Sequence, residues 1–217
     1  MSDSDISALY MSAEQRWRQN WVEGPTLQSE PLRRGQHAPN VELYEKGGSG
    51  VLMSSLWEER AVLIMLWRHL GCGCGIGRAE LLQEEYQLFD ESGLDVVVVA
   101  PGDPERVAEY KERYELPART LADPTYEAHK AFGLSHWSLE QVLYDAPDEY
   151  CELTPEVGKK FQDLRREDGR RMVDDPWMQS GEFMVGTDGV IRVAYLYNYC
   201  EDYPDPRLFT TAARLAG

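Results

Sequence analysis

The chain has 217 residues, 42% of them hydrophobic and 11% aromatic, which is enough apolar material for one globular domain with additions. Its formal net charge of -16, with no Lys- or Arg-rich run to offset it, argues against nucleic acid or anionic lipid as a partner. No apolar stretch approaches the length of a membrane span, and the opening segment lacks the pattern of a secretory signal. We therefore expect a cytoplasmic protein that binds neither nucleic acid nor membrane.

The first 34 residues predict an N-terminal extension that packs on a main domain formed by residues 35–217. Trp17 and Trp21 lie four positions apart in a helix-like stretch that ends before Pro25, so the two indoles share one helix face. We expect this face to pack against the main body rather than to bind a ligand.

The main domain begins with two short strands, at 41–43 and 50–53, around a Gly-rich turn. Residues 61–67 then form a continuous apolar run, which is typical of a strand buried on both faces and predicts the central strand of a sheet. Helical spacing of apolar residues follows over 79–89, and 95–100 is a second buried strand.

A helix is predicted from Pro104 to about Tyr114, with Asp103 as its N-cap. This βαβα alternation implies parallel strands joined by right-handed crossovers, because each helix must return the chain across the sheet. The remaining elements are a strand at 119–122, a short helix at 125–132 closed by Gly133, a polar and partly helical insertion at about 135–180, a hairpin at 183–199 with an Asp-Gly turn, and a last helix at 205–215.

Cys72 and Cys74 lie on the turn between the apolar strand and the following helix. Only 4 cysteines occur in the chain, so disulfides do not hold it together, and close-set cysteines in a reducing compartment are more often catalytic or metal-binding. The hairpin reverses the chain twice, so its second strand should run parallel to the strand ending at Trp67. We therefore expect Cys200, at the end of that second strand, to lie near the other two.

The start of a helix lowers the pKa of a nearby thiol, and both Cys72 and Cys74 qualify for this effect. No Asp or Glu occurs between Arg60 and Glu80, which leaves this stretch of an acidic chain electropositive. The basic and titratable residues around the cysteines are Arg68, His69 and Arg78. The pattern favours a reactive thiolate.

Two redox routes are open. Cys72 and Cys74 could form a small-ring disulfide, which strain would make oxidising. Alternatively, one sulfur attacks a peroxide and the resulting sulfenic acid is resolved by its neighbour or by Cys200. His69 could tune a cysteine or hold the turn, and Arg78 could stabilise a thiolate or be a surface residue at the start of the helix.

Other interpretations concern the same sulfurs. Cys72, Cys74 and Cys200, or two of them with His69, could hold a zinc or copper(I) ion, although a closed zinc site wants four ligands. Cys200 precedes two acidic residues, which should raise its pKa. Cys151 lies in the insertion and is expected to be an ordinary structural thiol. No organic cofactor is implied.

From about residue 35 to 215 the chain resembles the peroxiredoxin-like, AhpC/TSA-type branch of the thioredoxin-like superfamily. The resemblance rests on four motifs, which are Gly-Gln-His-Ala-Pro at 35–39, Leu-Trp-Arg-His-Leu-Gly-Cys at 66–72, Leu-Ala-Asp-Pro at 121–124 and Gly-Glu-Phe at 181–183. It implies an α/β thioredoxin-like fold, with a central mixed sheet flanked by helices.

The resemblance also implies a thiol-dependent oxidoreductase that uses a peroxide or disulfide substrate and a thiol reductant. By this resemblance Cys72 takes the position of the reactive cysteine and Arg68 that of a nearby arginine. The second cysteine stands one position earlier than in related members, and we interpret Cys74 as the resolving or paired thiol because it neighbours Cys72 on the turn. A homodimer is common among similar proteins. The alternative is a thioredoxin-fold metal-binding or non-catalytic accessory protein that uses the same cysteines.

Overall fold

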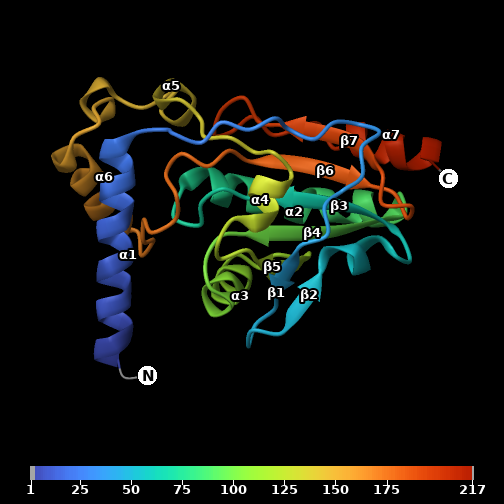
Figure 1. Cartoon of the computed structure of the whole chain (residues 1–217), viewed down its shortest axis with the longest axis horizontal. Helices are drawn as coiled ribbons and strands as arrows, with labels where there is room; N and C mark the ends of the chain where they lie inside the picture. Colours follow the sequence, from blue (N-terminus) through green and yellow to red (C-terminus); the bar gives the residue numbers. More distant parts are fainter. Residues whose placement is uncertain (1–2, 217) are drawn as a thin grey trace.

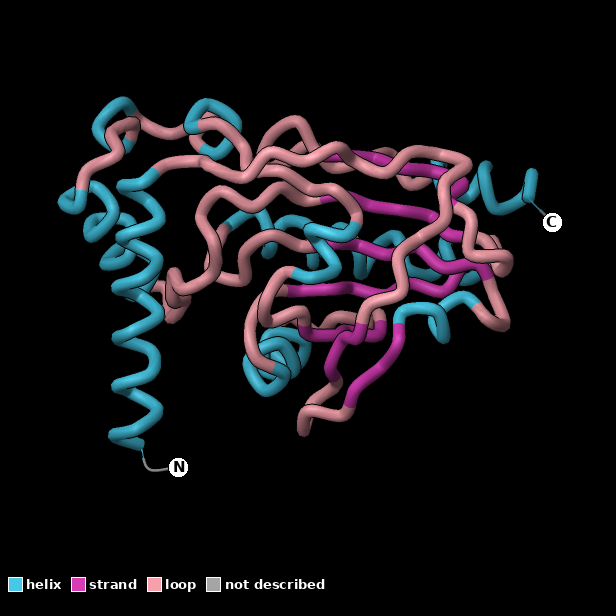
Figure 2. Tube along the Cα trace, viewed as in Figure 1, coloured by secondary structure: helices cyan, strands magenta, loops and turns pink. Residues whose placement is uncertain are grey.

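The computed structural model describes residues 3–216, which fold into a seven-stranded mixed sheet with helices on both faces (Figures 1 and 2). The strands are β1 Glu42–Tyr44, β2 Gly50–Leu52, β3 Ala61–Leu66, β4 Leu94–Ala100, β5 Arg119–Ala122, β6 Gly181–Val185 and β7 Ile191–Leu196. The α-helices are α1 Asp3–Glu23, α2 Gly73–Glu91, α3 Pro104–Arg113, α4 Glu127–Ala131, α5 Leu139–Val142, α6 Pro155–Glu167 and α7 Arg207–Ala216. Two 3-10 turns are η1 Met53–Trp57 and η2 Asp148–Tyr150.

The strand order is β2-β1-β5-β4-β3-β6-β7. Strands β3, β4 and β5 are parallel, as the βαβα pattern predicts, whereas β6 pairs antiparallel with β3 and β7 pairs antiparallel with β6. Strand β7 therefore runs parallel to β3, which confirms the argument from the hairpin. The middle position belongs to β4 rather than β3, because the β1-β2 hairpin extends the sheet beyond β5.

Strand β3 supplies apolar side chains to both faces of the sheet, as its uninterrupted apolar sequence predicts. Leu63 and Met65 pack on one face, under α2, α3 and α7. Val62 and Ile64 pack on the other, under α4 and the turn η1. Burial on both faces fixes the place where β3 ends, and therefore fixes the loop that carries the first two cysteines.

Short-range signals set the helix starts near this sheet. The Asp103 side chain accepts the Arg106 N–H and caps α3, as predicted. Asp123, from the Leu-Ala-Asp-Pro motif, accepts three backbone N–H groups at the start of α4, from Glu127 at 2.8 Å, Ala128 at 3.0 Å and His129 at 3.3 Å. Its carboxylate lies 2.8 Å from Nδ1 of buried His129, so one acidic side chain anchors this connection to the sheet.

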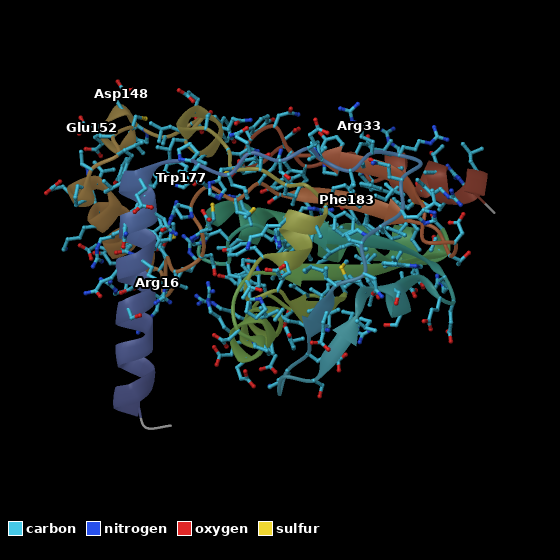
Figure 3. All side chains as sticks on the ribbon, viewed as in Figure 1. Arg16, Arg33, Asp148, Glu152, Trp177 and Phe183 are labelled. Carbon is cyan, nitrogen blue, oxygen red and sulfur yellow. The ribbon has the colours of Figure 1, made fainter. Side chains whose placement is uncertain are left out.

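The helix α1 stands at one side of the body and packs against α6, from the 135–180 segment (Figure 1). Trp17 and Trp21 are 2% and 1% exposed, and the Trp21 ring stacks between those of Trp17 and Trp177, with centroids 5.5 and 4.9 Å away. Figure 3 shows Trp177 beside α1. The shared indole face is thus confirmed, and its packing partner is the insertion. The division of the chain at residues 34, 135 and 180 stays a prediction.

Within residues 3–216, no helix combines the length and the apolar character that crossing a bilayer requires.

Replacing Trp21 by alanine should lower the free energy of unfolding by about 3–5 kcal/mol, because it leaves a cavity between two stacked indoles. Urea unfolding followed by far-ultraviolet circular dichroism measures the change. Val22→Ala is the matched control on the same helix. Val22 is 40% exposed, so its truncation should cost less than about 0.5 kcal/mol. Equal losses of unfolding free energy in the two variants would show that the indole stack stabilises the fold no more than the exposed valine does.

Candidate functional site

The loop after β3 delivers Cys72 to the start of α2, where it is the N-cap residue with extended backbone angles. Its side chain makes no capping hydrogen bond, so the sulfur is free for other contacts. The loop is held closely: a Cβ on Gly71 would come within 2.5 Å of the Arg171 carbonyl oxygen. Glycine at 71 therefore allows the 170–172 segment to cross directly over the cysteine loop.

Three sulfurs meet at this point. The Sγ atoms of Cys72, Cys74 and Cys200 all lie within 4.8 Å of one another. Cys72 is partly exposed, whereas Cys74 and Cys200 are 6% and 7% exposed. The parallel course of β7 and β3 brings Cys200 here, as predicted. Cys151 is exposed in the insertion and is not part of this sulfur cluster.

A buried arginine faces the sulfur cluster. Arg68 is 4% exposed, and its Nη1 lies 3.3 Å from the Cys200 Sγ. Its other nitrogens donate to main-chain carbonyls, from Nε to Met178 at 2.9 Å and from Nη2 to Pro176. The guanidinium also lies 5.3 Å from the centre of the Trp137 ring. The charge is thus fixed against the sulfurs by the segment that precedes β6.

The three thiols differ in acidity. Hydrogen bonds from the side chains of Cys200 and Cys74, with help from the charge of Arg68, hold the pKa of Cys72 well below its usual value, against the effect of burial. The same hydrogen bonding raises the pKa of Cys200 to about 12. Hydrogen bonding to the other two sulfurs, together with burial, raises the pKa of Cys74. These directions favour Cys72 as the sulfur of the cluster that ionises first.

The directions and causes of these pKa shifts correct two expectations from the sequence. Cys74, although it lies in the first turn of α2, is made less acidic, because it is buried and donates to an already ionised neighbour. Cys200 has the expected direction of shift, but its largest cause is hydrogen bonding to Cys72 rather than the acidic residues that follow it.

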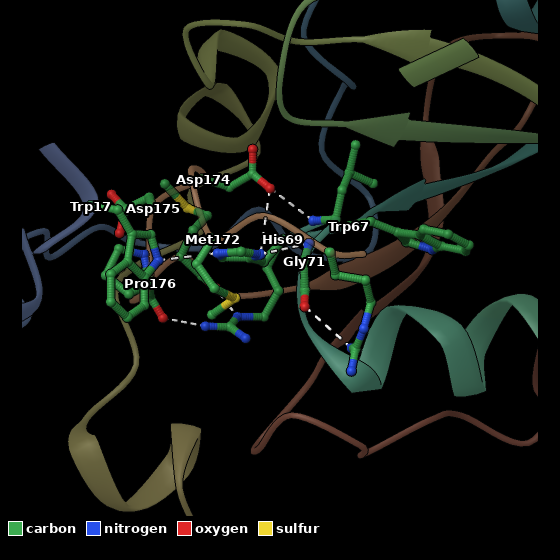
Figure 4. A network of polar contacts seen from close by, with 12 residues as sticks. Trp17, Trp67, His69, Gly71, Met172, Asp174, Asp175 and Pro176 are labelled. Atoms are coloured by element: carbon green, nitrogen blue, oxygen red, sulfur yellow. Dashed lines mark hydrogen bonds and ion pairs between the residues drawn. The ribbon is translucent and has the colours of Figure 1, made fainter. Parts of the chain in front are cut away.

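His69 ties the cysteine loop to α1 and to the insertion (Figure 4). The Trp17 indole N–H donates to its Nε2 at 3.1 Å, and the Asp174 carboxylate lies 3.4 Å from its Nδ1. Asp174 also accepts the Leu70 N–H at 2.8 Å and pairs with Arg106. Burial lowers the pKa of His69 to about 4, so the ring is neutral at physiological pH. These contacts favour the interpretation that His69 holds the turn.

Arg78 fits neither of the roles expected for it. It is 3% exposed, and it pairs with Glu182 at 2.8 Å and Glu85 at 2.9 Å. Its charge is therefore balanced by carboxylates and is not directed at the sulfurs. The helix α2 buries Arg78 because it turns this face toward β6.

Several residues of the site carry no signal that sequence reasoning could use. Trp137 and Tyr197 pack with the buried sulfurs, and the Trp137 indole donates to the Tyr197 carbonyl at 3.0 Å. The Tyr203 hydroxyl donates to the Cys74 carbonyl at 2.7 Å. The contact of Trp137 with Arg68 depends on how the insertion folds back onto the sheet.

A small cavity of about 80 Å³ leads to Cys72. It is mostly apolar, and its lining residues are Trp17, Trp21, Arg68, His69, Cys72, Val142, Leu143, Phe161, Arg165, Met172 and Pro176. Both α1 and the insertion contribute side chains to the walls of this approach to Cys72.

The fold and the sulfur cluster define a thiol oxidoreductase of the thioredoxin-fold, peroxiredoxin-like class. Residues 34–193 match the AhpC/TSA family, so the chain belongs to that family. The predicted family and enzyme class are thereby confirmed. The structure of the Peroxidoxin BcpB from Mycobacterium tuberculosis has the same fold, with a TM-score of 0.59 and 14% sequence identity over 85% of this chain and 97% of that one.

Two relatives extend the comparison. The chain is 24% identical over 170 residues to the chloroplastic thioredoxin-like protein AAED1 of Arabidopsis thaliana, which covers 76% of this chain. It is 26% identical over 107 residues to Peroxiredoxin Bcp of Bacillus subtilis, which covers 49% of this chain. Each alignment spans 66% of the relative's own length.

The alkylation rate of Cys72 by iodoacetamide should reach half its maximum at a pH below that of an ordinary cysteine, because only the thiolate reacts. Arg68→Met should move this midpoint to higher pH and lower the rate at pH 7 by about ten-fold or more. Exposed Cys151 is first changed to serine so that it does not react.

Arg214→Met, on the exposed side of α7, is the control for loss of one positive charge. A midpoint that stays in place in Arg68→Met, or moves equally in Arg214→Met, would show that Arg68 does not stabilise the thiolate.

Proposed function

We propose that this protein reduces peroxides with Cys72 as the nucleophile and an external thiol as the source of electrons. The observation that supports the proposal most strongly is the sulfur cluster: one partly exposed sulfur of lowered pKa lies within 4.8 Å of two buried thiols of raised pKa. A nucleophile and two protonated thiols within reach of it are the parts that this reaction needs. Relatives named as peroxiredoxins agree with this role.

In the first step the Cys72 thiolate attacks one oxygen of the hydroperoxide. The O–O bond breaks, Cys72 becomes a sulfenic acid, and the departing alkoxide or hydroxide takes a proton to leave as alcohol or water. Arg68, held beside the cluster, keeps the sulfur ionised before the attack and offsets charge on the departing oxygen.

In the second step a neighbouring thiol attacks the sulfenic sulfur, a disulfide forms and water leaves. Cys74 and Cys200 both lie within reach of Cys72, and either can serve. Two thiol groups of the external reductant then supply two electrons and restore both cysteines. The second reaction open to this site starts from the reduced cysteines: the Cys72 thiolate attacks a disulfide substrate, one substrate sulfur leaves as a thiolate, and the neighbouring thiol then attacks Cys72 and releases the other.

A soft metal ion is the second candidate for the cluster, as an accessory or metal-binding function. Three sulfurs within 4.8 Å of one another suit a three-coordinate copper(I) site, and zinc would need a fourth ligand. His69 does not offer it, because its Nε2 accepts the Trp17 N–H and its Nδ1 faces Asp174 and the Gly71 N–H. The adjacent charge of Arg68 opposes a cation, so we favour the redox function.

Protein purified without chelator should contain far less than one equivalent of zinc or copper, and its Cys72 should react freely with iodoacetamide. Elemental analysis beside a thiol titration measures both quantities. A stoichiometric metal that protects Cys72 from alkylation would favour the binding function instead.

All four cysteines are free thiols in the structure. A cytoplasmic location, where thiols are kept reduced, and an antioxidant role are part of the same proposal. Assembly as a homodimer stays a prediction.

Cys72→Ser should lower thiol-dependent peroxide reduction by about 10³-fold or more, because a hydroxyl cannot replace the thiolate. Peroxide consumption in the presence of dithiothreitol is the assay, and Cys151→Ser should keep full activity. Mass spectrometry after one equivalent of peroxide should find Cys72 in a disulfide with Cys74 or Cys200. Full turnover by Cys72→Ser would end the proposal.

A further inference from the structure

A second cavity, of about 270 Å³, lies beside the cysteine loop, between α3 and the segment that follows α6. Its lining residues are Leu70, Arg106, Glu109, Tyr110, Arg113, Tyr114, Gly169, Arg170 and Arg171. We call it the arginine pocket. It is separate from the apolar cavity at Cys72, and the crossing segment 170–172 lies between the two.

The arginine pocket is basic in a chain whose formal charge is -16. Four of its lining residues are arginines, and Glu109 is the one acidic residue among them. The expectation that no Lys- or Arg-rich run offsets the acidic background overlooked the arginines at 165, 166, 170 and 171. Because charged walls around a cavity concentrate the field inside it, this pocket attracts small anions.

The arginines differ in how their charge is balanced. Arg106 pairs with Asp174, and Arg170 pairs with Asp168 at 2.6 Å. The hydrogen bonds of Arg113 within the described chain go to main-chain carbonyls, of Gly169 at 2.9 Å and Asp168 at 3.2 Å. A carbonyl accepts a hydrogen bond without cancelling the charge, so Arg113 keeps its charge for a ligand.

Two largely buried side chains, those of Arg170 and Tyr110, distinguish the pocket from a chance group of surface arginines. The side chain of Arg170 is only 9% exposed. Tyr110, on the wall of the pocket, is 7% exposed, and its hydroxyl has no hydrogen-bond partner within the described residues. The hydroxyl lies toward the first turn of α2, 2.9 Å from where a Cβ on Gly75 would be, so this side chain packs the wall of the pocket against the helix that carries the cysteines.

The pocket adjoins the reactive sulfur. The Arg170 Nη1 donates to the Gly71 carbonyl at 3.2 Å, and a Cβ on Gly73 would lie 3.8 Å from the same nitrogen (Figure 4). The guanidinium of Arg170 therefore lies against both residues that flank Cys72. The arginine pocket therefore borders the loop that carries Cys72.

We propose that the arginine pocket binds the carboxylate of a small anionic thiol and that this thiol is the reductant of oxidised Cys72. The proposal rests on the proposed function. Arg113 would hold the carboxylate, since arginine matches carboxylate geometry with paired N–H groups, and Arg170, paired with Asp168, would hold the cysteine loop beside it. The apolar cavity stays available for the peroxide.

The reduction consumes two molecules of the thiol. The first, as thiolate, attacks Cys72 in its disulfide with Cys74 or Cys200, so that a mixed disulfide forms and the partner sulfur leaves as a thiolate and takes up a proton. The second attacks the sulfur of the bound thiol in that mixed disulfide, releasing the Cys72 thiolate and the oxidised disulfide of the small thiol. The two electrons that reduce the protein come from these two thiols.

The test compares 3-mercaptopropionate, which carries a carboxylate, with 2-mercaptoethanol, which does not, as electron donors for peroxide reduction. Arg113→Gln should lower kcat/KM for 3-mercaptopropionate by about ten-fold and leave that for 2-mercaptoethanol unchanged. Arg113→Lys should recover part of the loss, and Arg214→Ala should change neither value. Equal losses with both thiols, or no loss, would overturn the proposal.

A binding measurement keeps this test independent of turnover. S-methylglutathione carries carboxylates but has no free thiol, and calorimetry should show that it binds the wild type and Arg214→Ala at least about ten-fold more tightly than Arg113→Gln. Absence of binding to the wild type at millimolar concentration would refute the pocket, even if peroxide reduction is confirmed. Binding without any thiol-dependent turnover would refute the proposed function and the reductant role, leaving only the anion site.

Discussion

The arrangement of the site depends on one constraint, the burial of the Arg68 guanidinium beside the sulfurs of Cys72, Cys74 and Cys200. Taking an arginine out of water costs several kcal/mol unless its N–H groups and its charge are both matched. The N–H groups of Arg68 reach two main-chain carbonyls and the sulfur of Cys200, and the hydrogen bonds described for it include no carboxylate. The positive charge of Arg68 lowers the pKa values of Cys72 and of the Asp175 carboxyl, so the burial of Arg68 and the acidity of Cys72 support each other.

Most of what holds Arg68 in place comes from the 135–180 segment. Pro176 and Met178 supply the carbonyls, and Trp137 lies beside the guanidinium. The same segment packs on α1 through stacked indoles, and Trp17 from α1 reaches His69 in the cysteine loop. Parts of the chain that lie outside the sheet thus complete the site, and the large side chains that they bury are Trp17, Trp21, Trp137 and Trp177.

The three thiols of the sulfur cluster differ in pKa, which suits them to different roles. One site can hold a nucleophile and its resolving partner only if the partner stays protonated until it is needed. The shared hydrogen bonds achieve this, because each bond that lowers the pKa of Cys72 raises the pKa of a neighbour. Cys74 and Cys200 stay protonated and donate hydrogen bonds to Cys72, and these bonds stabilise its ionised form.

The sequence alone determined the order of strands and helices, the strand-to-helix turn at Cys72 and the approach of Cys200, because these follow from local periodicity, caps and the direction of each strand. Tertiary structure decided the rest. It buries Arg78 in an ion pair with Glu182 and brings the Asp174 carboxylate into contact with both His69 and Arg106. It also lowers the pKa of Cys72 and raises the pKa of Cys74. Burial and pairing across about 100 residues of sequence depend on how distant segments pack, and no local pattern encodes that.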